Sequence, residues 1–145
     1  MSTTAASLAA TAALVVAVVS LLVWHALFAG NPVAVAAQVV AGALMLAARL
    51  AFGTRSFHAG ANPTEGGLVT RGPYRFLRHP IYSAILLFVW AGVLSHASIR
   101  NVAAAAVASG AIAGRIAAEE RLVVARYPEY AGYAARTKRV IPFVL

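Results

Sequence analysis

The 145-residue sequence contains no cysteine and few charged residues. The absence of cysteine excludes disulfide bonds, thiolate metal sites and a cysteine nucleophile. Charged residues make up 11% of the chain and hydrophobic residues 61%, and the mean hydropathy is +0.80. This composition excludes the soluble globular class and predicts an all-α integral membrane protein. The length leaves room for one domain, which we expect to cover residues 1–145.

Four apolar segments are long enough to span a membrane, which takes about 20 mainly apolar residues per helix. They lie at about residues 5–29, 33–52, 80–97 and 99–118. The first has no basic region before it and is too long for the apolar part of a signal peptide, so we expect a retained span. Asn31-Pro32 predicts a tight turn after it. The tail, residues 119–145, is expected to carry a helix at the cytoplasmic membrane surface.

The basic residues are distributed unevenly. The net charge is +8, and four spans would place every lysine and arginine except Arg100 on one side of the membrane. This asymmetry is the positive-inside pattern, so we expect the connecting loop 53–79, the tail and both termini to be cytoplasmic, at a bacterial inner membrane. Anionic lipid headgroups are then the expected partners of the surplus charge, in preference to nucleic acid. The oligomeric state stays open.

The loop before the third span is basic and rich in turn-forming residues, including Gly66-Gly67 and Gly72-Pro73. His79-Pro80 is expected to open the third helix, because proline is favoured at the first helical position. The free N–H groups of a helix start attract anions, so this boundary predicts a seat for an anionic group near Tyr82. The alternative is an ordinary helix entrance with interfacial arginine and aromatic anchors.

A second candidate is the pair Arg115 and Glu119 at the inner end of the fourth span. Residues four apart share a helix face, and ionisable groups at this depth usually face the bundle interior or a wet cavity. A solvated helix end just past the membrane is the alternative. Together, loop and tail offer an anion seat, a carboxylate, a guanidinium and aromatic rings. S-adenosylmethionine, with its carboxylate, ammonium, sulfonium and adenine, is one ligand among several that would suit them.

These residues also occur in a recognisable order. The run from Gly66 to Tyr82, which contains Arg78-His79-Pro80-x-Tyr82, is followed by Arg115-x-x-x-Glu119-Glu120 and by Tyr130-x-x-Tyr133-x-x-Arg136-Thr137-Lys138-Arg139-Val140-Ile141-Pro142. This combination, over about the last 80 residues, resembles the isoprenylcysteine carboxyl methyltransferase family and its bacterial relatives. The resemblance implies a membrane enzyme that transfers a methyl group from S-adenosylmethionine, with a prenylcysteine carboxylate as acceptor in the best-known members.

The resemblance also implies roles for individual residues. Arg115 matches the arginine that holds the acceptor carboxylate, and Glu119 matches a cofactor-binding glutamate. The other implied cofactor contacts come from the loop and the start of the third span: Gly66, Gly67, Leu68, Val69, Tyr74, His79, Pro80, Ile81 and Tyr82. An ionised carboxylate needs no general base, so alignment would supply most of the catalysis.

Three other functions would fit parts of this sequence. A lipid methyltransferase acting on an amine or another heteroatom would need a base, for which His79 is the obvious histidine. A nicotinamide-dependent sterol reductase ranks low because such chains are far longer. A non-catalytic protein could use the basic loop to bind anionic lipid. His25 and His96 are interpreted as packing or interfacial residues, His58 has no assigned role, and no metal site is predicted.

Overall fold

The computed structural model describes residues 3–53 and 67–141. Four long helices run side by side: α1 (Thr3–Val23), α2 (Pro32–Phe52), α3 (Pro80–Ser95) and α4 (Ile99–Arg126). A 3-10 helix, η2 (Gly72–Arg75), precedes α3, and a short helix, α5 (Tyr130–Arg136), follows α4. The part of the chain that the structure describes is all-helical, as predicted for an all-α membrane protein. The predicted site residue Gly66 lies outside the described residues.

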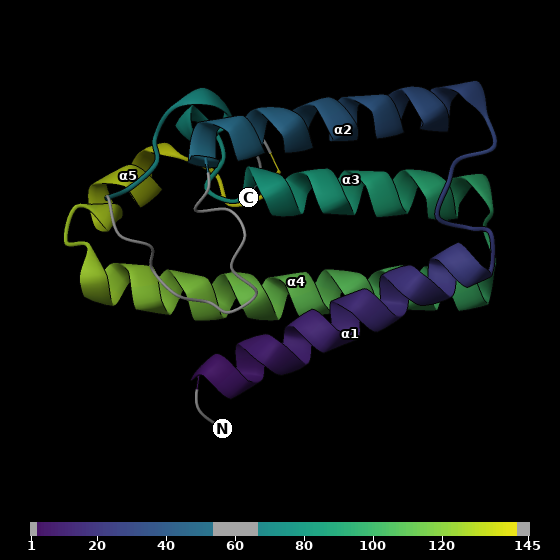
Figure 1. The fold of residues 1–145 in the computed structure, drawn as a ribbon, viewed down its shortest axis with the longest axis horizontal. Helices are drawn as coiled ribbons and strands as arrows, with labels where there is room; N and C mark the ends of the chain where they lie inside the picture. Colours follow the sequence, from purple (N-terminus) through teal and green to yellow (C-terminus); the bar gives the residue numbers. More distant parts are fainter. Residues whose placement is uncertain (1–2, 54–66, 142–145) are drawn as a thin grey trace.

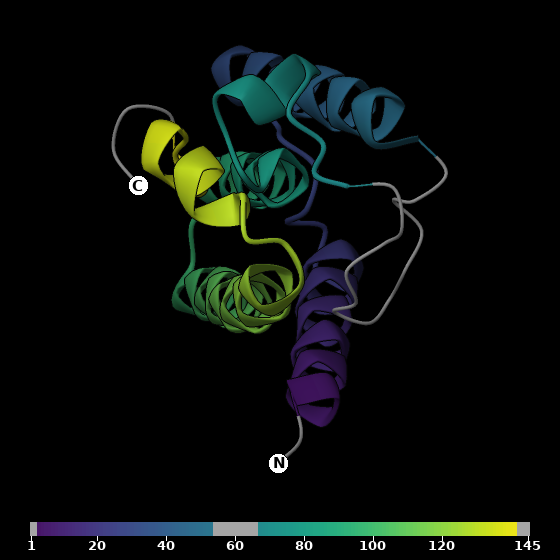
Figure 2. The ribbon, with the colours of Figure 1, turned by 90° about the vertical axis from the view of Figure 1, so that its left-hand side faces the viewer.

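The four long helices form two antiparallel pairs (Figures 1 and 2). α1 packs along α4, α2 packs along α3, and a smaller contact between α3 and α4 joins the pairs. The end of the bundle where α2 ends and α3 begins is called the loop end here, and the opposite end is called the turn end. α4 ends at the loop end and α5 lies beside it there. Residues far apart in the sequence therefore meet at one end.

The turn end is held by apolar packing. Its buried cluster consists of Leu21, Ala26, Leu27, Val89, Val93 and Ala105. Residues 24–31, called the crossing here, connect α1 to α2 across this end, and Gly92 of α3 lets them approach that helix closely. A Cβ at Gly92 would overlap the carbonyl group of Leu27, whose carbon would be 2.7 Å away. The backbone of the crossing therefore packs directly against the backbone of α3 at Gly92.

A buried amide fixes the same crossing to two helices. Nε2 of Gln38, on α2, donates to the carbonyl oxygens of Leu27 at 2.7 Å and Phe88 at 3.0 Å, and its Oε1 accepts from the N–H of Ala29 at 3.0 Å. The bonds to Leu27 and Ala29 satisfy backbone groups that lie beyond the end of α1. Gln38, which interrupts an apolar run in the sequence, thus stabilises the turn between the first two spans.

Helix starts agree with the sequence better than helix ends do. Pro80 is the first residue of α3, as predicted. Pro32, which was predicted to lie in the turn before the second span, is the first residue of α2, and the side chain of Asn31 caps α2 by accepting from the N–H of Ala34 at 2.9 Å. The predicted first span was too long at its end: α1 stops at Val23, because the chain turns at His25 with φ 54° to cross the turn end. α3 ends at Ser95 rather than at residue 97.

The helix that contains the fourth predicted span, residues 99–118, continues without a break to Arg126. Within residues 3–53 and 67–141, three helices, α1, α2 and α4, are long and apolar enough to cross a membrane, whereas the 16-residue α3 is an apolar helix of shorter length. At 1.5 Å per residue α3 is about 24 Å long. The extension of α4 carries Glu119 and Glu120 on the same helix, which ends at Arg126, two residues before Pro128.

Candidate functional site

Arg115 is a buried charge at the loop end, on α4, with 6% of its surface exposed. Its Nε donates to the hydroxyl of Tyr82 on α3 at 2.7 Å, and its Nη2 donates to Oε1 of Glu119 at 3.1 Å. Its Nη1 donates to Oγ1 of Thr11 on α1. The guanidinium therefore joins three helices. Because an unpaired buried charge is costly, these contacts also hold the side chain in one place.

Glu119 and Tyr82 lie directly beside this guanidinium. The Tyr82 hydroxyl donates to Oε1 of Glu119 while it accepts from Arg115. The other carboxylate oxygen of Glu119 is 3.9 Å from Nδ1 of His79, at the start of α3. The Glu119 side chain is 24% exposed, against 13% for Glu120. Of the two neighbouring acids, Glu119 is the more accessible to a ligand.

Glu120 points into a different set of contacts. Its Oε1 lies 3.3 Å from Nε2 of His79, 3.6 Å from Nη1 of Arg78 and 3.2 Å from the hydroxyl of Tyr130. Its Oε2 accepts from Nε and Nη2 of Arg139 at 3.2 Å and 3.1 Å. Such a carboxylate, surrounded by donors, stabilises the structure around it. Glu120 therefore ties α4 to both the loop and the tail.

The loop and the tail are joined along their backbones as well. Leu77 and Lys138 form an isolated parallel β-bridge, with the N–H of Arg78 donating to the Lys138 carbonyl at 2.7 Å. The N–H of His79 donates to the carbonyl of Arg139 at 3.0 Å, and the hydroxyl of Ser83 donates to that of Val140 at 2.6 Å. Tail carbonyls thus occupy part of the helix start for which the sequence predicts an anion seat.

Two tyrosines of α5 anchor this junction through their hydroxyl groups. Tyr133 is buried and donates to the carbonyl of Tyr74 at 2.8 Å. Burial raises the pKa of Tyr133 to about 12. Burial, with Glu120 nearby, also raises the pKa of Tyr130 above that of an ordinary phenol. Both hydroxyls therefore remain protonated at neutral pH and act as hydrogen-bond donors.

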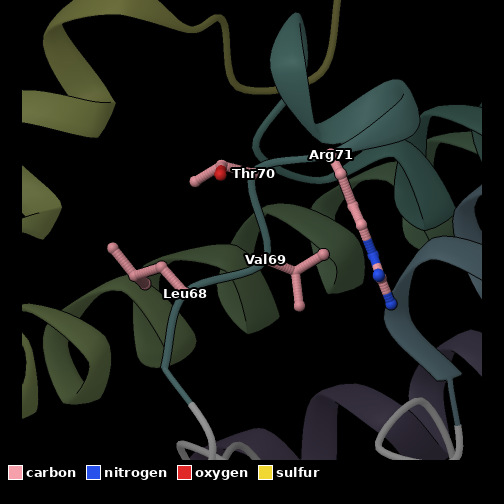
Figure 3. Close-up of a pocket in the computed structure, with 4 residues that line it drawn as sticks. All are labelled: Leu68, Val69, Thr70 and Arg71. Carbon is pink, nitrogen blue, oxygen red and sulfur yellow. The ribbon is translucent and has the colours of Figure 1, made fainter.

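A cavity lies next to the segment that leads into η2 (Figure 3). Its volume is about 260 Å³, and the described residues that line it are Leu68, Val69, Thr70 and Arg71. Arg71 points toward α2, where its Nε donates to the carbonyl of Ala51 at 3.2 Å. Small-molecule sites typically enclose about 300–1,000 Å³. The cavity is just below that range, and two of the predicted cofactor contacts line it.

The structure brings four predicted residues into mutual contact: Arg115, Glu119, Tyr82 and His79. Pro80 is buried at the start of α3, and the next residue, Ile81, is half-buried. Tyr74 packs instead against Phe52, with ring centroids 5.6 Å apart. Gly67 adopts φ 80°, a conformation that glycine reaches without strain.

Thr11 was missed by the sequence reasoning. It is one hydroxyl in a long apolar helix, and such residues commonly bond to their own backbone. Thr11 does so, donating to the carbonyl of Ser7 at 2.8 Å, but it also accepts from Arg115. The signal available in the sequence was the presence of two hydroxyl side chains, Ser7 and Thr11, four residues apart on one face of an apolar helix. Without the structure, nothing indicated that this face meets Arg115.

Fold and site together define an integral membrane protein with an ionic site at one end of its helix bundle. Residues 31–130 match the family model described as phospholipid methyltransferase. The chain therefore belongs to the phospholipid methyltransferase family, a family of membrane methyltransferases. The resemblance noted from the motifs is confirmed at this level.

A relative in Cupriavidus metallidurans, named cobalt-zinc-cadmium resistance protein CzcN, is 39% identical over 80 residues. The match covers 52% of this chain and 35% of the relative, so the chain spans about a third of that protein's length. No solved structure matches the chain. Among the described residues no group of three or more histidine, cysteine, aspartate or glutamate side chains could hold a metal ion.

Proposed function

We propose that this protein transfers a methyl group from S-adenosylmethionine to a lipophilic acceptor at the cytoplasmic face of the membrane. The favoured acceptor is the carboxylate of a prenylcysteine-like or other lipophilic acid. The observation that carries the proposal is the buried guanidinium of Arg115, which contacts both Tyr82 and Glu119. One cluster thereby places an anion-binding group beside an acid that suits a cationic ligand group.

The residues present fit such a cofactor. Glu119 is partly exposed and offers a carboxylate for an ammonium group or ribose hydroxyls. The cavity beside Leu68 and Val69 offers backbone groups and apolar surface for a base. Gly66, Gly67, Tyr74, His79, Pro80, Ile81 and Tyr82 complete the proposed contact set. When bound, S-adenosylmethionine supplies an electrophilic methyl group on a sulfonium centre.

The protein's own contribution would be binding, alignment and exclusion of water. Arg115 would bind the acceptor oxygens, in competition with Glu119, while Tyr82 keeps the guanidinium oriented. The acceptor is already ionised at neutral pH, so no side chain has to remove a proton. Holding two reactants in line can lower a barrier by about 7–11 kcal/mol. Alignment by Arg115 is thus the step on which the proposed activity depends.

Methyl-label transfer tests the proposal. Purified protein in detergent is given labelled S-adenosylmethionine together with either total lipid extract or a small prenylated thioether acid. Label in the acid, as a base-labile ester, supports carboxyl methylation. Label in the lipid extract alone would replace it with the alternative below. No saturable binding of S-adenosylmethionine would exclude both.

The alternative acceptor is the amine of a phospholipid or a small lipophilic amine. The family description supports it, and so does the position of His79 between Glu119 and Glu120. An ammonium acceptor must lose a proton before it attacks, and His79 would be the base. A rate that falls as pH is lowered, because the protonated amine cannot attack, favours this acceptor. A carboxylate acceptor predicts a flat profile around neutral pH.

A third possibility is a protein without catalytic activity that uses its basic loop to bind anionic lipid. Arg71, Arg75 and Arg139 are exposed at the loop end, and membrane lipids are expected partners in every case. Thermal unfolding separates this possibility from the enzymes. Stabilisation by S-adenosylhomocysteine supports a methyltransferase, whereas stabilisation by anionic lipid alone supports the binding function. The cytoplasmic placement of the loop end is part of the same proposal.

A further inference from the structure

Helix α1 lies outside the part of the chain that matches the family, residues 31–130, yet it reaches the site. The contact is made by Thr11, whose Oγ1 accepts a hydrogen bond from Nη1 of Arg115. The same hydroxyl donates to the carbonyl of Ser7 at 2.8 Å. Its proton is therefore directed away from the guanidinium and its lone pairs face Arg115. An oriented acceptor of this kind defines where one end of the guanidinium lies.

We propose that Thr11 is a positioning residue for Arg115, and that α1 thereby completes the acceptor side of the site. The proposal rests on the function proposed above. Tyr82 and Glu119 bind the Nε and Nη2 atoms of Arg115, whereas Thr11 binds Nη1 from the separate helix α1. Contacts from α1, α3 and α4 together orient the plane of the guanidinium. Removing the contact from α1 loosens this orientation, and in-line transfer tolerates little misalignment.

The packing of α1 on α4 keeps this contact in place. A Cβ added at Gly114, next to Arg115, would lie 3.9 Å from the Cβ of Ala10, next to Thr11. Small residues at such a crossing allow helices to approach closely within a membrane. Ser7 is fully buried one turn before Thr11, and its Oγ has no hydrogen-bond partner among the described residues. Burial and short side chains thus hold the Thr11 hydroxyl at Arg115.

Replacing Thr11 by valine, which keeps the shape and removes the hydroxyl, tests the proposal. Two quantities are measured in detergent: the KM and Kd of an S-farnesyl thioether carboxylic acid, and the Kd of S-adenosylhomocysteine. We expect Thr11→Val to raise both constants for the acid about tenfold, the loss typical of a hydrogen bond to a charged group. The Kd of S-adenosylhomocysteine should stay within about twofold, and Thr11→Ser should restore the acid constants.

Ser7→Ala is the matched control, because it removes a buried hydroxyl from the same face of α1 without touching Arg115. It should leave the constants of both ligands unchanged. If Thr11→Val does not fold, Thr11→Ala takes its place, with Thr11→Ser again as the restoring variant.

Several outcomes overturn the inference. Wild-type constants for the acid in Thr11→Val would show that Arg115 does not need Thr11. A parallel loss of S-adenosylhomocysteine affinity, or the same loss in Ser7→Ala, would show a structural role for this helix face. These results leave the proposed function intact. Wild-type protein that binds neither the acid nor S-adenosylhomocysteine overturns the proposed function, and this inference with it.

Discussion

The two ends of the helix bundle are built on different physical principles. At the turn end, six buried apolar residues pack together and Gln38 satisfies the backbone of the crossing chain. At the loop end, the buried groups are ionic and aromatic and belong to α1, α3, α4, the loop and the tail. Apolar packing has no preferred direction, whereas hydrogen bonds require defined geometry. The turn end can therefore serve as a support, and the loop end can orient a ligand.

The largest effect expected is on turnover, from Arg115→Ala at the loop end. We expect the variant to lose about 10²–10³-fold in kcat, as when one preorganised donor is removed from an active site. S-adenosylmethionine binding should be largely kept. Glu119→Ala should instead weaken binding of that ligand. Calorimetric titration of both variants, alongside the methyl-transfer assay, distinguishes the two roles.

The contact between Arg115 and Glu119 sharpens this test, because each removal leaves the other charge with one partner fewer. Arg115→Lys keeps the charge and loses the planar fork, so it should bind S-adenosylmethionine as the wild type does and still turn over slowly. Equal loss of cofactor affinity in Arg115→Ala and Glu119→Ala would reverse the assignment of roles.

The next largest effect is expected on stability, from Gly92→Ala at the turn end. The new Cβ would overlap the backbone carbonyl of Leu27, which cannot move aside without displacing the crossing. We expect a loss of about 3 kcal/mol in the free energy of unfolding, measured by denaturation in detergent micelles. Gly110→Ala is the matched control, since its Cβ would have nothing within 4 Å. Equal stability of the two variants would contradict the close packing described here.

Gln38→Leu is a milder test of the same end. It removes both donors and the acceptor that pair with Leu27, Phe88 and Ala29, and buried backbone groups left without partners cost about 1–3 kcal/mol. The affinity for S-adenosylhomocysteine should be unchanged under conditions where the variant is folded. A stabilised variant would mean that the amide is dispensable there.

The smallest effect is expected from Tyr133→Phe, which loses the hydrogen bond to Tyr74 and about 1 kcal/mol of stability. The pKa of Tyr133 is raised to about 12, so its contribution is fully present below about pH 10 and is lost as pH rises toward 12. The difference in unfolding free energy between wild type and variant, measured from about pH 8 upward, should therefore shrink above about pH 10. A constant difference would show that the hydroxyl does not titrate in this way.

The sequence predicted the elements of this fold well where local chemistry decides. Pro80 opens α3 as predicted, α2 begins within one residue of the predicted start, and the basic residues of the loop and tail meet at one end. Helix ends were predicted less well, because they depend on packing. α1 ends at Val23 because the chain turns there and crosses over Gly92. No local signal at residues 24–29 marks that turn.

The site was predicted in part for the same reason. Arg115 and Glu119 lie four apart on one helix, so their contact follows from helix geometry. The contact with Thr11 joins residues 104 positions apart, and no short-range pattern specifies it. Short-range patterns also do not specify that Glu119 and Glu120 make different contacts. Only the position of the tail decides that Glu120 faces Arg78, Tyr130 and Arg139.

By itself, then, the sequence determined that this chain is a helical membrane protein with its charge gathered beside a methyltransferase-like motif. Hydropathy, proline positions and residue spacing act over one helix or one turn, and they can be read without the fold. The tertiary structure decided which helices pair, which of two adjacent acids stays accessible, and that α1 reaches Arg115. Those outcomes depend on the packing of side chains from distant segments, which the complete fold alone brings together.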